Sequence, residues 1–238
     1  MRTLSDILDR AFTLLLLADR GLLERQSHAG GTYSLAERED KRAVFQNIIE
    51  SRSLCNHLTD GEANHINTPV GQLPDDFFWA TQHQFEAIPI LLWVAGLQPF
   101  PSYLPDFNGT DYHNVLGKYR TERWRQKPVL QQESDVRTYY GVVFLWHWRV
   151  IEGRGRDVFK TADAFDLIRN IFGDEFDSAF QYIEVASEKP CDFVAGKHRY
   201  NELEERSANT LRVVSTWRHH ALEWVLGSDS WDATETNT

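Results

Sequence analysis

Apolar residues recur at helical spacing along most of the chain, beginning close to its first residue. Between Leu4 and Leu22 they fall every three or four positions, and Thr3 with Asp6 can cap the start of such a helix. The pair Gly30-Gly31 then interrupts the pattern. This stretch predicts a first amphipathic helix.

Two capping boxes, at 34–37 and 59–62, predict two further helix starts. In each, a Ser or Thr hydroxyl accepts from an early backbone N–H while a Glu three residues later reaches back to the cap. The apolar spacing behind the first box predicts a helix that continues to about Cys55. The second box opens a shorter helix that ends near Asn67.

The most apolar helix is predicted from about residue 75 to residue 95, and its few polar positions indicate a central place in the fold. Pro89 should kink it, because proline lacks an N–H and its ring crowds the preceding turn. Gly96 is placed for the C-terminal cap.

Four segments complete the helical pattern. In residues 134–152 tryptophans alternate as in a strand, but the apolar spacing also fits a helix and the length favours one. Further helices are predicted over about 161–172, 174–187 and 200–226, the last ended by Gly227.

The remaining segments read as a loop and a tail on a single domain spanning residues 1–227. Residues 98–112 hold prolines and aromatics and predict a long loop, a candidate for a mobile cover over a cleft. The tail 228–238 is polar and acidic except for Trp231, which can pin it back onto the domain.

Composition refines this picture to a mainly α, multi-helix bundle with a Trp/Phe-rich core. The chain has 238 residues, including 8 Trp and 14 Phe, which is enough apolar area for a core without disulfides or metals. We expect these rings to pack inside and the titratable groups to lie scattered outside.

The two cysteines and the first helix bear on location. Cys55 and Cys191 are far apart and form no C-x-x-C motif, so buried free thiols in a reducing cytosol are expected. The apolar run 11–18 is too short to span a membrane and does not follow a basic start as in a signal peptide. The sequence predicts a cytoplasmic protein without membrane contact.

Several stretches together are similar to those of a known family: Phe85-Glu86-Ala87 with residues 91–97, Leu58-Thr59, His147-Trp148, residues 221–227 and Trp231-Asp232. In this order they resemble the bacterial proteins catalogued as domain of unknown function 4272. The resemblance covers most of the chain, with residues 158–197 as a possible insertion. It implies a single helical domain and no particular activity.

Metal binding is the sharpest enzymatic hypothesis. Residues three apart share a helix face, and three such pairs occur: His83 with Glu86, His220 with Glu223, and Glu62 with His65. A di-iron bundle takes two Glu-x-x-His pairs plus two further carboxylates, and only the last pair has that order. Chance pairing among 9 His and 35 acidic residues is the alternative.

Other chemistry has weaker support. Cys191 has no sequence cue for a lowered pKa, and Gly153–Arg156 matches no phosphate-binding motif and reads as a turn. Basic residues interleave with Tyr and Trp over 118–127, as in single-strand binding, but the net charge of −10 disfavours nucleic acid.

An aromatic-lined pocket between helices is a further possibility, although most tryptophans fall on predicted core faces: Trp79, Trp93, Trp146, Trp148, Trp217 and Trp224. The polar residues expected to line such a pocket are Glu86, His147 and His220, with Trp148 beside them.

The absence of catalytic motifs favours a binding or interaction module, such as an immunity-type or regulatory protein, without a cofactor. Its acidic surface suits a basic protein partner. The alternative is a metal-assisted hydrolase or oxidase that uses His83, Glu86, His147, His220 and Glu223.

Overall fold

The computed structural model describes residues 1–28, 33–74, 76–103, 128–151, 164–186, 191–227 and 229–236. The basic run 118–127, the turn 153–156, residues 104–112 of the predicted loop and parts of the possible insertion lie outside them. Within the described residues the chain is mostly helical, which confirms the predicted fold class.

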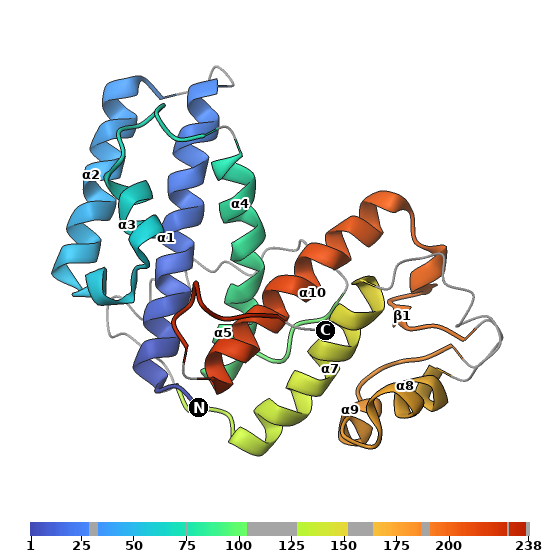
Figure 1. Ribbon diagram of the computed structural model, residues 1–238. Coiled ribbons are helices and arrows are strands. Elements are labelled where there is room, and N and C mark those ends of the chain that lie inside the picture. The colour runs from blue at the N-terminus through green and yellow to red at the C-terminus, as the bar shows by residue number, and fades with distance from the viewer. Residues whose placement is uncertain are drawn as a thin grey trace.

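Four helices lie together at the N-terminal side (Figure 1): α1 (Leu4–His28), α2 (Leu35–Ser51), α3 (Asp60–Asn67) and α4 (Phe77–Gln84). Both predicted capping boxes are present, at Ser34–Glu37 and at Thr59–Glu62. The second helix ends earlier than predicted, because Ser53 adopts a left-handed backbone with φ of 56°. A short 3-10 helix, η1 (Leu54–His57), follows it.

The predicted helix 75–95 is divided into three parts: α4, the 3-10 turn η2 (Phe85–Ala87) and α5 (Ile88–Val94). Pro89 has no N–H to offer the carbonyl of Phe85 and its ring crowds that carbonyl, so the break falls one turn before the proline. After α5, Gly96 has φ of +69° and the Leu97 N–H donates to the Leu92 carbonyl at 2.9 Å. These features confirm the predicted glycine cap.

The ambiguous segment is a helix, α7 (Glu133–Ile151), which lies beside the long helix α10 (Glu205–Leu226) (Figure 1). Two short helices, α8 (Ala164–Phe172) and α9 (Asp177–Phe180), follow α7 in sequence. Gly141 lets α9 approach α7 closely, because a Cβ there would lie 3.1 Å from both Ala179 Cβ and Phe176 Cδ1.

The region before α10 differs from the prediction. In place of a helix over 174–187 there is only α9, and residues 194–199 form a hairpin of β1 (Val194–Ala195) and β2 (His198–Arg199). A 3-10 turn, η4 (Tyr200–Glu202), precedes α10, which starts later than predicted. The buried Asp192 explains the difference, because its carboxylate binds Arg149 on α7 and accepts from the Phe193 and Asn201 N–H groups.

The core is built from aliphatic and aromatic side chains, but two expectations about it are wrong. Titratable side chains are not confined to the surface, since Arg10, Arg20 and Arg149 are among the largest fully buried side chains. Trp79 does not face the core: it is 56% exposed. Among the described residues, no helix combines the length and apolarity needed to cross a membrane.

Candidate functional site

Two imidazoles meet at the interface of α7 and α10. The Nδ1 atoms of His147 and His219 are 2.7 Å apart, and both side chains are buried. At this distance one nitrogen donates and the other accepts, because two protonated nitrogens would repel and two unprotonated ones would have no hydrogen between them.

Three further side chains extend the pair into a hydrogen-bonded chain. The Thr216 hydroxyl lies 3.2 Å from His147 Nε2. At the other end, Glu223 Oε1 lies 3.4 Å from His219 Nε2 and accepts from the Tyr140 hydroxyl at 2.6 Å. We call these five side chains the imidazole network.

One protonation pattern gives a hydrogen-bond partner to each of the five side chains in the network. Hydrogen bonding by His219 and then by Tyr140 lowers the pKa of Glu223 against the opposing effect of burial, so Glu223 accepts as a carboxylate. His219 then carries its proton on Nε2 and accepts at Nδ1 from the Nδ1–H of His147. That leaves His147 Nε2 to accept from Thr216.

This pattern keeps the His147 ring neutral near pH 7. Burial, reinforced by neighbouring His219, lowers the pKa of His147 to about 4. Burial and the hydrogen bond to Glu223 both raise the pKa of Tyr140. The arrangement can therefore take up or pass one proton between Thr216 and Glu223, but only against the cost of placing a charge in the helix interface.

His219 was not identified from the sequence, whereas His147 was. The prediction considered only pairs three residues apart, and His219 with Glu223 are four apart, a spacing that also places two side chains on one helix face. The i, i+4 pair was the available signal. The spacing of this pair gave no sign that His219 contacts α7.

The other predicted pocket residues do not join His147. No hydrogen bond, ion pair or ring contact links any two of Glu86, His147 and His220 in the described structure. Burial raises the pKa of half-buried Glu86, which lies near Arg218. Trp148 packs edge-on against Phe172.

The candidate metal ligands are likewise separate. His83 is exposed on α4, and Glu62 is engaged by Arg10 at 2.5 and 2.8 Å. His220 contacts tryptophan rings rather than sharing a ligand set with Glu223. Within the described ranges, no three His, Cys, Asp or Glu side chains are placed to hold one metal ion.

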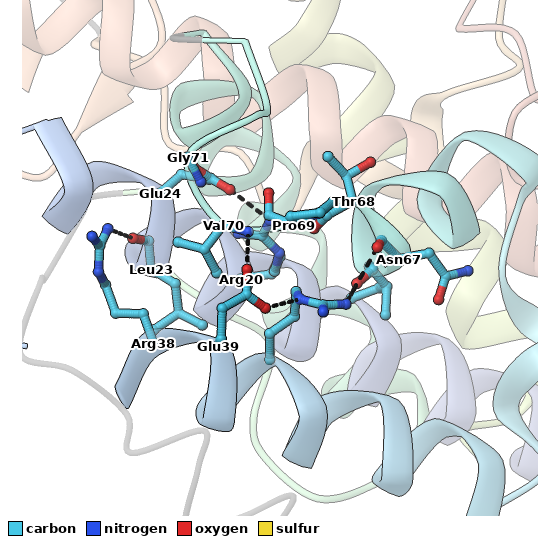
Figure 2. Close-up of polar contacts among 12 residues, drawn as sticks. Arg20, Leu23, Glu24, Arg38, Glu39, Asn67, Thr68, Pro69, Val70 and Gly71 are labelled. Atoms are coloured by element: carbon cyan, nitrogen blue, oxygen red, sulfur yellow. Dashed lines mark hydrogen bonds and ion pairs between the residues drawn. The ribbon is translucent and has the colours of Figure 1, made fainter. Parts of the chain in front are cut away.

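A second polar network joins α1 and α2 to the loop 67–71 (Figure 2). Glu24 on α1 accepts from the Gly71 N–H at 2.7 Å and Glu39 on α2 accepts from the Val70 N–H at 2.6 Å. Arg20 Nη2 contacts Glu24 at 2.5 Å and the Thr68 carbonyl at 3.0 Å. We call this the arginine network.

Charges in the arginine network stay ionised because they balance one another. Burial lowers the pKa of Arg20, and Glu24 opposes that effect. Burial acts to raise the pKa of Glu39, but hydrogen bonds from Arg42 and Val70 outweigh it and the pKa is lowered. The network fixes the loop onto two helices through these paired charges and backbone hydrogen bonds.

A third feature lies on the surface where α1 crosses α4. At Gly21 a Cβ would lie 3.4 Å from Phe78 Cα, so the two helices are in close contact there. Beside the crossing, Leu22 is 42% exposed and Trp79 is 56% exposed. Arg25 lies one turn from Leu22 and 5.7 Å over the Trp79 ring, which joins these three residues into one surface, the α1–α4 patch.

Carboxylates flank the α1–α4 patch on both helices. Asp19 precedes Leu22 by three residues on α1, and exposed Asp76 precedes Trp79 by three residues at the start of α4. Since residues three apart lie on one helix face, each apolar side chain has a carboxylate one turn away. The patch therefore has an aromatic centre with acidic residues at its edges.

Neither a protein-family model, nor a curated protein, nor a solved structure matches this chain. The resemblance to domain of unknown function 4272 therefore stays a prediction, and the site is described by its own geometry.

Proposed function

We propose that the chain is a binding module that holds a basic protein partner on the α1–α4 patch. The observation that carries the proposal is the exposure of Trp79 beside Leu22 and Arg25. Tryptophan and arginine are the residues most often responsible for binding energy in protein interfaces, and a large indole left in water gains most from being covered.

Charge supports the choice of partner. The chain carries a net charge of −10, and Asp19 and Asp76 flank the patch. A partner that inserts an apolar side chain between Leu22 and Trp79 with Lys or Arg on either side would meet both features. Such complementarity speeds association and disfavours acidic competitors.

We place this module in the cytoplasm, as its cysteine usage predicts. Cys55 and Cys191 are both free and neither takes part in a disulfide; Cys191 is buried as expected, whereas Cys55 is exposed, which corrects the expectation of two buried thiols. Free thiols are typical of proteins that work in a reducing compartment.

The test is affinity capture from the native host, comparing the wild-type chain with Trp79→Ala and with Tyr182→Ala as the matched control. Tyr182 is exposed to a similar extent but lies outside the patch. We expect one basic protein to be retained by the wild type and by Tyr182→Ala. Trp79→Ala should weaken its binding by about 30-fold, the equivalent of ~2 kcal/mol for an interface hot spot.

Charge reversal provides an independent check. Asp76→Lys should weaken capture and reduce its salt sensitivity, whereas Asp60→Lys, an exposed position in the first turn of α3, should leave both unchanged. A partner captured equally by all variants, or none that depends on Trp79, would remove the support for this function.

A further inference from the structure

The segment that follows α10 is held to the molecule by the buried side chain of Trp231 and by the Asp229 carbonyl, which accepts from Arg2 Nη2. It passes back beside α1 (Figure 1), and Trp231 is 4% exposed while Asp229, Ser230 and Asp232 around it are exposed. Two of its backbone hydrogen bonds, from Ala233 to Ser230 and from Thr234 to Trp231, stay within the segment's own turn.

Three side chains form the surroundings of the Trp231 ring. The guanidinium of Arg10 on α1 lies 4.1 Å from its centroid. On α10, the rings of His220 and Trp224 meet it edge-on at 4.4 and 5.5 Å. A cation over the ring face and aromatic edges around it are a specific environment for an indole. We call these three residues the indole site.

Contacts that do not involve Trp231 hold the indole site in place. Glu62 binds both terminal nitrogens of Arg10, and the His57 carbonyl accepts from the same guanidinium at 3.2 Å. Arg2 lies 4.8 Å over the Trp224 ring and donates to the Trp224 carbonyl at 3.1 Å. The site would therefore keep its shape if the segment left.

Trp231 does not satisfy every polar group around it. Arg10 Nε and His220 Nε2 are both inaccessible to water and have no hydrogen-bond partner among the described residues, although the His220 ring also hydrogen-bonds the backbone of Trp231. Buried polar atoms of this kind lower stability unless a partner is supplied. An occupant that brings an acceptor beside its ring would bind better than one that brings the ring alone.

We propose that the indole site is a peptide-binding site for a tryptophan within an acidic segment, occupied in cis by Trp231 and able to accept the same segment from a second copy of the chain. The acidic residues Asp229, Asp232 and Glu235 around Trp231 suit the cationic Arg2, whose guanidinium donates to the Asp229 carbonyl, since the charge of Arg10 is already balanced by Glu62. The indole site shares no residue with the α1–α4 patch, so this inference is independent of the proposed function.

Competition with the Trp231 of the same chain sets the difference in peptide affinity that we expect between the wild type and Trp231→Ala. A short flexible connection gives a tethered ligand an effective concentration on the order of millimolar. A peptide added at micromolar concentration cannot displace such a ligand, but it can enter the site once Trp231 is removed. Removing the indole of Trp231 should therefore allow the added peptide to bind, whereas Trp231 occupies the site in the wild type.

The experiment titrates a dye-labelled peptide with the sequence of residues 227–236 into full-length Trp231→Ala and follows fluorescence anisotropy. We expect saturable binding, at least ten-fold tighter than to the wild type. Tyr182→Ala, which loses an exposed aromatic side chain outside both proposed sites, should behave as the wild type, and a peptide with Ala at the position of Trp231 should not bind.

Two outcomes overturn the inference: no saturable binding to folded Trp231→Ala up to about millimolar peptide, or binding that does not need the indole of the peptide. If Trp231→Ala does not fold, free indole provides the second measurement. Recovery of a cooperative thermal unfolding transition on adding indole supports the site, and no recovery overturns it.

Discussion

The arginine network between α1 and α2 and the imidazole network between α7 and α10 bury polar groups in opposite ways. The first pairs fixed charges: Arg20 is fully buried against Glu24, which is 2% exposed. The second joins two buried imidazoles and points each N–H at the next acceptor. The first network depends on both members of each charge pair, whereas the second depends on His147 staying unprotonated.

The difference shows where this fold is fixed and where it can respond to its surroundings. Charge pairs hold loop 67–71 whatever the proton concentration, since guanidinium and carboxylate ionise far from neutral pH. Imidazole is the side chain whose ordinary pKa lies near neutrality, so burying His147 makes the stability of the α7–α10 interface depend on pH below 6.5.

Breaking the arginine network should give the largest effect. In Glu24→Ala the guanidinium of Arg20 loses its buried counter-charge and the Gly71 N–H loses its acceptor. Two other nitrogens of Arg20, Nε and Nη1, already lack hydrogen-bond partners. We expect the free energy of unfolding to fall by about 3–5 kcal/mol, as for other buried pairs left with one member, measured by urea denaturation at pH 7.

The matched control is Glu133→Ala, which removes an exposed partner of Arg137 on α7. A solvated pair contributes little, so this variant should be indistinguishable from the wild type in the same assay. Equal destabilisation by the two substitutions would mean that burial does not decide the strength of these pairs.

Acid should act on the imidazole network. His147 has a pKa of about 4 in the folded chain against an ordinary 6.5. The unfolded chain therefore binds a proton below pH 6.5 that the folded chain refuses, and stability present above pH 6.5 is lost as the pH falls toward 4. The full loss from this one group is roughly 3 kcal/mol.

His147→Asn isolates this contribution, because an amide can still donate to His219 but does not titrate. Urea denaturation of both proteins at several pH values between 7 and 4.5 should show a shallower decline for the variant. His65 and His220, whose pKa values burial also lowers, remain in both proteins and cancel in the comparison. Parallel curves would show that His147 does not set the pH response.

Local signals in the sequence account for much of the fold. Hydroxyl–carboxylate spacing located the starts of α2 and α3, and the Gly96 cap and the Pro89 break follow from backbone chemistry within one turn. The hairpin before α10 could not be found this way. It depends on Asp192 meeting Arg149, a residue 43 positions away in sequence.

The residues of the candidate sites could be predicted to a smaller extent than the fold, because contacts between residues far apart in sequence decide them as well. His147 and His220 were singled out as polar residues among aromatics, but which imidazole faces which helix is decided by the rotation of α10 against α7. His219 and His220 are adjacent in sequence and join different clusters. The exposure of Trp79 likewise depends on the close crossing of α1 and α4 at Gly21.

The smallest effect should come from the half-exposed end of the imidazole network. Tyr140→Phe removes the hydroxyl that donates to Glu223 at 2.6 Å and changes nothing else in the side chain. A hydrogen bond to a carboxylate contributes about 1–2 kcal/mol, less where water can replace it. The pKa of Glu223 should rise, since this bond helps to lower it, so the variant should lose stability at a higher pH than the wild type.

Tyr182→Phe is the control, because its exposed hydroxyl makes no hydrogen bond to a described residue. Urea denaturation at pH 7 and pH 5 measures both effects, and a Tyr140→Phe variant that matches Tyr182→Phe at both values would show that Glu223 orients His219 without help from α7.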